Sequence, residues 1–166
     1  MSKKIAIPKK EKVKVKPVKA GLGGWLIVVG FGLIVGAVVG PFGLVGYISL
    51  LFDQLAIPGF TTVLLVEIVF QTIFVVFDIY LLFLFFKKKK KFPELYILFL
   101  YFLIAWSIID YVLVAHLSAS TPQLKKFLDE YLSETTKEMG RTILSSFIWI
   151  IYTHKSKRVK ATFVKD

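Results

Sequence analysis

The chain lacks cysteine altogether, so it cannot form a disulfide framework or a thiolate metal site. It also lacks the motifs of membrane hydrolases, since it contains neither a His-Glu-x-x-His zinc sequence nor a serine flanked by glycines at the spacing of a nucleophile turn. Acidic residues are scarce, with 11 Asp and Glu against 22 Lys and Arg. These absences predict a non-enzymatic protein without a metal or cofactor.

Apolar surface, in contrast, is present in excess. Of the 166 residues, 56% are hydrophobic and 16% are aromatic, and the mean hydropathy is +0.70. A soluble domain of this size cannot bury so many apolar side chains. The charged residues are gathered into blocks, which leaves long apolar stretches between them. A helix needs ~20 such residues to cross the hydrocarbon layer of a membrane. We therefore predict an all-α, polytopic integral membrane protein whose surface is largely covered by the lipid bilayer.

Four apolar segments predict a bundle of four transmembrane helices. They cover residues 23–40, 60–86, 93–115 and 143–152. Pro41 is expected to kink or end the first helix, and the apolar character that resumes through residue 52 leaves its continuation open. Before the fourth helix, residues 122–139 place apolar side chains at helical spacing opposite a charged face. This pattern predicts an extracytoplasmic amphipathic helix lying on the outer surface of the membrane.

The basic residues predict the topology. Eight lysines precede the first apolar segment, five occupy residues 87–91 and five Lys or Arg follow His154, against four elsewhere. Because Lys and Arg collect on the cytoplasmic side, both termini are expected in the cytoplasm. The lysines would also attract anionic lipid headgroups, whereas nucleic acid is not expected because no aromatic residue interleaves the lysines of the tail. We assign a lysine-rich tail (1–20), a four-helix domain (21–154) and a basic tail (155–166) in the cytoplasmic membrane.

Polar side chains within or beside the apolar segments are the candidate functional residues. They are Glu67, Gln71, Asp78, Ser107, Asp110 and Arg141. With three acids and one base, at least one carboxyl group is expected to be protonated, exposed to water or neutralised by a ligand. One interpretation is a passage for a proton, a cation or a cationic solute. The other is structural, with Glu67 reaching the outer interface while the aspartates join helices through Ser, Gln or Arg partners.

Depth in the membrane separates these candidates. Counted from the basic ends, Asp78 lies ~3 Å below the midplane, while Asp110 lies ~10 Å and Glu67 ~14 Å above it. The resulting ~13 Å between Asp78 and Asp110 argues against a catalytic pair of carboxylates. His116 and His154 are expected at opposite faces of the membrane, so they cannot share a metal ion.

Glycines mark one edge of the first helix. Gly32, Gly36 and Gly40 recur every four residues and therefore lie on the same side. Small residues at this spacing let another helix approach closely. The pattern does not distinguish a second copy or a partner protein from a neighbouring helix of the same bundle.

Several segments resemble a known family. Residues 21–26 (GLGGWL) look like the opening signature of the domain of unknown function 2569 (DUF2569) family, and residues 85–93 (FFKKKKKFP) resemble its central basic turn. Residues 148–150 (IWI) and 156–163 (SKRVKATF) resemble its ending. The resemblance implies four helices in a bacterial cytoplasmic membrane. It implies no activity and no catalytic or binding residues.

Two functions remain open. The glycine edge, the small size and the missing catalytic motifs favour a non-enzymatic accessory subunit or a self-associating membrane component, with a protein partner or a homo-oligomer. The intramembrane carboxyl groups and the arginine favour a small transporter or channel component.

Overall fold

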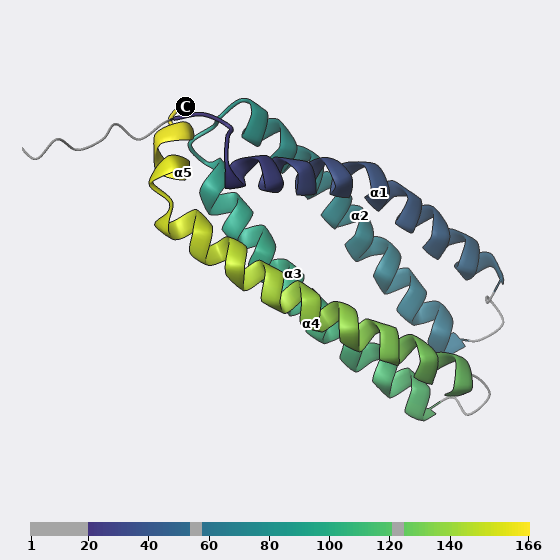
Figure 1. The fold of residues 1–166 in the computed structure, drawn as a ribbon. Helices are drawn as coiled ribbons and strands as arrows, with labels where there is room; N and C mark the ends of the chain where they lie inside the picture. Colours follow the sequence, from purple (N-terminus) through teal and green to yellow (C-terminus); the bar gives the residue numbers. More distant parts are fainter. Residues whose placement is uncertain (1–19, 54–57, 121–124) are drawn as a thin grey trace, which may run out of the picture.

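The computed structural model describes residues 20–53, 58–120 and 125–166, and these residues are mainly helical. The helices are α1 (Trp25–Asp53), α2 (Pro58–Phe86), α3 (Phe92–Ser120), α4 (Lys125–Lys155) and α5 (Lys157–Thr162) (Figure 1). The extended pairing in the described ranges is a single bridge between Lys89 and Lys165. The prediction of an all-α protein is confirmed. Residues 1–19 of the predicted tail, and the start of the predicted amphipathic helix at 122–124, lie outside the described residues.

Three helices are long and apolar enough to cross a membrane. Their spans are Trp25–Asp53, Gly59–Phe86 and Phe92–Ser120, with mean hydropathies of 2.3, 2.4 and 2.3. At ~1.5 Å per residue, each is ~40 Å long, against a hydrocarbon layer of ~30 Å. Large apolar side chains project outward from them; Phe31 is 65% exposed and Phe42 is 73% exposed. Such a surface requires lipid around it, so the chain is a membrane protein.

The first helix runs through Pro41 and ends at Asp53. Of the two outcomes that the sequence left open, the structure therefore has the continued helix. Proline removes one N–H group from the helical hydrogen-bond ladder, but apolar helices in membranes tolerate this loss where neighbouring helices and local adjustments compensate. The long α1 can consequently pack along α2 beyond the proline.

The predicted surface helix is not a separate element. Residues 125–139 form the first half of α4, which continues without a break to Lys155. This half packs against α3: Leu128 is 1% exposed and belongs to an apolar cluster with Val114 and Leu117. The Ser118 hydroxyl of α3 also donates a hydrogen bond to Asp129 Oδ1 at 2.7 Å. The apolar face that predicted contact with the membrane surface instead faces a neighbouring helix.

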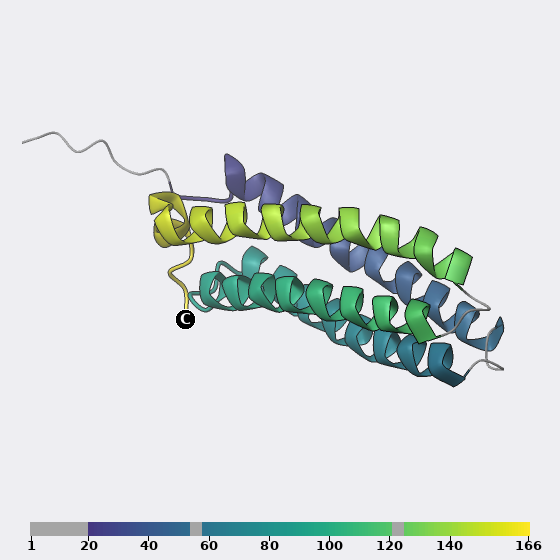
Figure 2. The ribbon, with the colours of Figure 1, turned by 90° about the horizontal axis from the view of Figure 1, so that it is seen from below.

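The long helices form two packed pairs. Helix α1 packs along α2, α4 packs along α3, and α2 joins the pairs through a smaller contact with α3. The α2–α3 turn and α5 lie at one end of the bundle, while the last turns of α1 and α3 lie at the other (Figures 1 and 2). One apolar core, including Leu81 and Phe92, extends from the α5 end, and a smaller one around Leu128 lies at the far end.

Candidate functional sites

Two buried carboxyl groups meet near the end of the bundle that lies away from α5. Glu67 of α2 is only 6% exposed, and its carboxyl group faces that of Asp110 of α3 at hydrogen-bonding range. Glu67 Oε1 and Asp110 Oδ1 are both buried without a hydrogen-bond partner among the described residues. Two carboxylates cannot donate to each other, so a hydrogen bond between them requires a proton on one. The pair is therefore suited to holding a proton.

Two tyrosines complete this four-helix acidic site, which consists of Tyr47, Glu67, Asp110 and Tyr131. Tyr47 of α1 and Tyr131 of α4 approach each other and the carboxyl groups, so each long helix contributes one polar side chain. A cavity of about 50 Å³ lies among them, within apolar walls. This volume admits a water molecule or a small ion but is below the ~300 Å³ of typical organic ligand sites.

Neither tyrosine was predicted from the sequence as a site residue. Tyr47 lies in an otherwise apolar segment, and Tyr131 belongs to the apolar face of the predicted amphipathic helix. Their hydroxyl groups were the available signal, because a tyrosine in an apolar segment packs its ring against apolar neighbours and directs its hydroxyl group to polar ones. In the structure, Glu67 is buried inside the bundle. The structural interpretation of the sequence had instead placed its carboxyl group at the outer interface.

The third buried carboxyl group belongs to Asp78 and lies apart from this site. Asp78 is 6% exposed, and its Oδ2 has no hydrogen-bond partner within the described ranges. It lies against α1, where a Cβ atom added to Gly36 would be 2.6 Å from Oδ2. Nearby, Gln71 Nε2 donates to the carbonyl oxygen of Gly40 at 3.1 Å. Gly36 and Gly40 thus bring α1 close to α2 of the same chain, whereas a Cβ atom on Gly32 would meet no atom within 4 Å in the described part of the chain.

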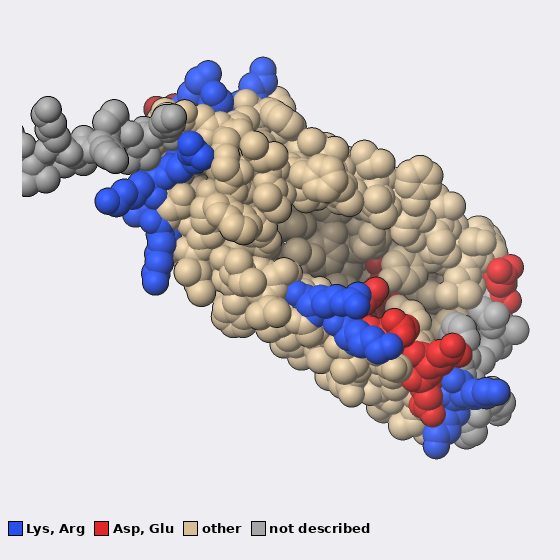
Figure 3. All heavy atoms as spheres, in the orientation of Figure 1, with Lys and Arg blue, Asp and Glu red and all other residues tan. Residues whose placement is uncertain are grey.

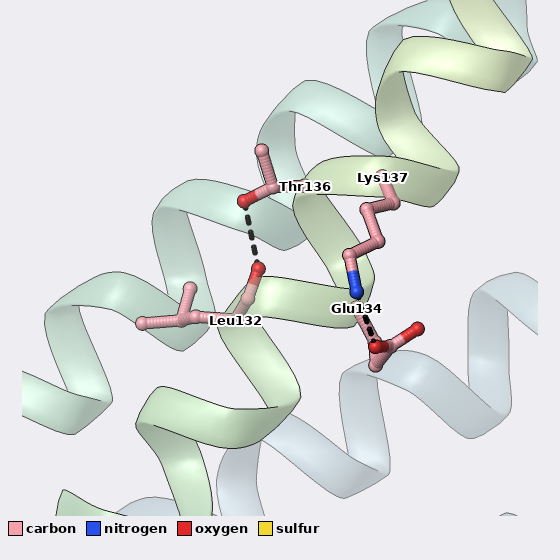
Figure 4. A network of polar contacts seen from close by, with 4 residues as sticks. All are labelled: Leu132, Glu134, Thr136 and Lys137. Atoms are coloured by element: carbon pink, nitrogen blue, oxygen red, sulfur yellow. Dashed lines mark hydrogen bonds and ion pairs between the residues drawn. The ribbon is translucent and has the colours of Figure 1, made fainter.

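Ser107 and Arg141 belong neither to the four-helix acidic site nor to the surroundings of Asp78, which we call the second acidic site. The Ser107 hydroxyl donates to the carbonyl oxygen of Ile104 in its own helix at 2.9 Å. Arg141 is exposed, and no ion pair links it to a carboxyl group in the part of the chain that the structure describes. Figure 4 shows the ion pair that α4 does form, between Lys137 and Glu134 at 2.7 Å. The predicted cluster therefore divides between two acidic sites, and its arginine lies on the surface.

The described ranges contain no cluster of side chains that could bind a metal ion. No group of three or more His, Asp or Glu side chains is positioned there to hold an ion. The acidic sites are accordingly considered for protons, small cations and organic cations.

A groove of about 420 Å³ separates α1 from α4. The glycine edge of α1 forms one wall, α2 and α3 contribute Asp78 and Tyr96, and α4 contributes Trp149. Figure 3 shows the molecule hollowed between α1 and α4, on a face where uncharged residues predominate. The groove follows from the packing, because each of these two helices packs mainly on its own partner.

The chain segments that resemble the family signature come together at the α5 end. The Gly21 amide donates to Thr162 Oγ1 at 2.9 Å. The ring of Phe163 stacks on that of Phe92 with a centroid separation of 4.5 Å and lies beside Phe85 at 5.7 Å. We call this assembly of residues 21–26, 85–93 and 156–163 the clasp.

The backbone favours glycine at one position of the clasp. Gly24 has φ +60°, which an L side chain rarely adopts, and the Arg158 guanidinium group lies beside it. A family model described as a protein of unknown function (DUF2569) matches residues 19–164, which include the whole clasp. The chain belongs to the DUF2569 family. The predicted resemblance is confirmed.

The match to DUF2569 covers more than the clasp. Both acidic sites and the groove lie inside residues 19–164, so they are parts of the family domain. The search of curated proteins and the search of solved structures each found no match. Because the family description assigns no activity, function has to be argued from these sites.

Proposed function

We propose that this DUF2569 protein is a small transport component that moves protons or small cations through the four-helix acidic site. In this proposal, the chain crosses the cytoplasmic membrane four times with both termini in the cytoplasm. The fourth crossing is the second half of α4, which contains the apolar residues 143–152. Helix α4 has 31 residues and is ~46 Å long, so ~15 Å of its charged first half would extend beyond the hydrocarbon.

The distribution of charge supports this orientation. The lysines at 87–91 and the basic residues after His154 lie at the α5 end, and Figure 3 shows Lys and Arg gathered there. Acidic and basic side chains are mixed along the first half of α4. Under the positive-inside rule, this distribution supports a cytoplasmic α5 end.

One observation carries the transport proposal: Glu67 and Asp110 face each other, and each has one buried oxygen without a partner among the described residues. Burying carboxyl groups in a membrane protein is costly, and a purely structural role would be expected to satisfy their oxygens through hydrogen bonds. The small cavity limits the occupant to a proton, water or a small ion. The hydroxyl groups of Tyr47 and Tyr131 can donate and accept, so they could relay a proton.

Reconstitution tests this function. Liposomes with a trapped pH-sensitive dye would be given a potassium diffusion potential, and protein-dependent proton entry would be measured, followed by entry of small cations. We expect Glu67→Gln and Asp110→Asn each to reduce the active flux about tenfold or more, equivalent to ~1.4 kcal/mol. Glu130→Gln, which neutralises an exposed carboxyl group on α4, should match the unchanged protein. Absence of any protein-dependent flux would refute the proposal, as would full flux in Glu67→Gln.

A second candidate is the accessory or self-associating component, and Gly32 favours it. Gly36 and Gly40 face Asp78 and Val75 of the same chain, but none of the described residues lies within 4 Å of a Cβ atom at Gly32. Its neighbour Phe31 is 65% exposed. A helix from a second copy or from a partner protein could therefore approach α1 at Gly32.

The native mass in mild detergent, with all co-purifying chains identified, tests association. We expect a discrete complex that Gly32→Leu dissociates. Gly46→Leu is the matched control, since that position also faces open space on α1. Gly36→Leu does not discriminate, because its side chain would collide with Asp78 inside the bundle. A monomer without partners would exclude this candidate.

Both candidates are non-enzymatic and have the bilayer as a partner. Asp78 lines the groove and Asp110 lines the smaller cavity, which argues against a catalytic dyad of these two aspartates. At the α5 end, a surface cavity of about 580 Å³ is lined by four lysines, two acidic residues (Glu94 and Asp166) and apolar side chains. We propose that anionic lipid headgroups bind there, which neutralising Lys90 and Lys165 together should weaken in native mass spectra with bound lipid.

A further inference from the structure

We propose that the groove between α1 and α4 binds a hydrophobic organic cation, with the carboxyl group of Asp78 as its counter-charge. This site is separate from the four-helix acidic site, and the inference does not depend on ion movement there. The expected ligand carries a positive charge, either permanent or from a protonated amine, on an apolar framework that can pack against aromatic rings.

The charge of the groove points to a cation. Asp78 is the one acidic or basic side chain among the described residues that line it. The aspartate is 94% buried, given its 6% exposure, and its Oδ2 lacks a partner in the described ranges. The other strongly polar lining group, the Gln71 amide, already donates to Gly40. A carboxyl group in apolar surroundings is stabilised as an anion only by a cation or by donors, and no donor among the described residues bonds to Asp78 Oδ2.

The walls of the groove suit an organic ion better than an inorganic one. Aromatic rings of Phe74, Tyr96, Phe99 and Trp149 line it. Cations are attracted to the faces of such rings, most strongly where water is excluded. The volume of about 420 Å³ falls within the ~300–1,000 Å³ of small-molecule sites, whereas a bare metal ion would need more ligands than one carboxyl group.

The glycine edge sets where the carboxyl group lies. A side chain at residue 36 would clash with Asp78 Oδ2, so glycine lets the Asp78 side chain lie against α1 in the wall of the groove. Gly32 and Gly40 line the same side of the groove, and neither places a side chain in it. A second copy of an apolar helix would cover the groove but would leave the carboxyl group without a counter-charge, so it is the less suitable occupant.

Binding of radiolabelled tetraphenylphosphonium to the full chain in detergent micelles tests the inference. We expect saturable binding to the unchanged protein and at least about tenfold weaker binding by Asp78→Asn, equivalent to ~1.4 kcal/mol. Glu94→Gln removes an exposed carboxyl group at the start of α3 and should bind as the unchanged protein does. In separate samples tetraphenylborate, an anion of the same shape, should show no saturable binding.

A second variant keeps the test decisive if Asp78→Asn does not fold. Trp149→Leu removes one aromatic wall and should weaken binding of the cation severalfold. The inference is overturned if tetraphenylphosphonium shows no saturable binding, if a folded Asp78→Asn binds it equally, or if tetraphenylborate binds as well as the cation. The last result would identify an apolar cavity for lipid chains. None of these outcomes alters the liposome test of Glu67 and Asp110, because no flux is measured here.

Discussion

The carboxyl group of Asp78 in α2 lies against the backbone of Gly36 in α1, in the space that a side chain on residue 36 would fill. A Cβ atom there would be 2.6 Å from Asp78 Oδ2. The contact makes this glycine part of the packing between two helices of one chain. It also leaves a carboxyl oxygen beside the groove.

Replacing Gly36 should reveal this contact. We expect Gly36→Ala to lower the free energy of unfolding by about 1–3 kcal/mol, because the Asp78 carboxyl group must move. Gly32→Ala should be neutral or stabilising by up to ~1 kcal/mol, because its Cβ meets open space and alanine favours helix. Thermal unfolding of both variants in the same detergent measures the difference. Equal effects would show that residue 36 is not closely packed.

Glu67 and Asp110 should behave as a coupled pair in stability as well as in transport. We expect Glu67→Gln and Asp110→Asn to be non-additive by about 0.5–3 kcal/mol, because each substitution changes the hydrogen bond that the other residue makes. Glu67→Gln combined with Asp78→Asn is the control, since these residues lie ~16 Å apart along α2 and should be additive within ~0.5 kcal/mol. A double-mutant cycle of unfolding free energies measures both. Additivity of the first pair would contradict a shared proton.

The clasp should depend on Phe163. This side chain is 4% exposed between aromatic neighbours, so Phe163→Ala should cost about 3–5 kcal/mol of stability and make the C-terminal segment accessible to protease. Val164→Ala, at a side chain that is 62% exposed, provides the control and should leave both measurements unchanged. Protease resistance equal to the unchanged protein in Phe163→Ala would show that stacking does not hold the clasp.

Topology can be tested with single cysteines, because the natural chain has none to interfere. In intact cells, a membrane-impermeant maleimide should label Ser133→Cys in α4 but not Lys90→Cys or Lys157→Cys. All three positions are exposed in the structure, so protection reports the side of the membrane. Labelling of Lys157→Cys together with Ser133→Cys would place the C-terminus outside and remove the fourth crossing.

The extent of α2 could be predicted because it depends on local sequence, whereas the end of α1 beyond Pro41 was left open. The prediction of a helix at 60–86 is close to the observed Pro58–Phe86, since the lysines that follow residue 86 end the apolar run. The first half of α4 was predicted differently because an apolar stripe looks the same whether it covers lipid or another helix. In the structure, Leu128 packs against Val114 and Leu117 of α3, so this stripe covers another helix.

The acidic sites show the same division. Spacing placed Glu67, Gln71 and Asp78 on one face of α2, and depth counting separated Asp78 from the other two acids. Spacing could not bring Tyr47 and Tyr131 to the Glu67–Asp110 pair, nor could it move Arg141 to the surface. Those placements depend on the rotation of each helix about its axis and on its register against its neighbours.

By itself, the sequence determined that this is a membrane protein, where its apolar segments lie along the chain, and where its basic residues gather. These properties follow from the free energy of transferring each segment into lipid, which is summed residue by residue along the chain. Only the tertiary structure decided that the Asp78 carboxyl group packs against Gly36, that four helices enclose one pair of carboxyl groups, and that a groove remains between α1 and α4. Such contacts arise from interlocking side chains far apart in the chain, so they are properties of the packed helices together.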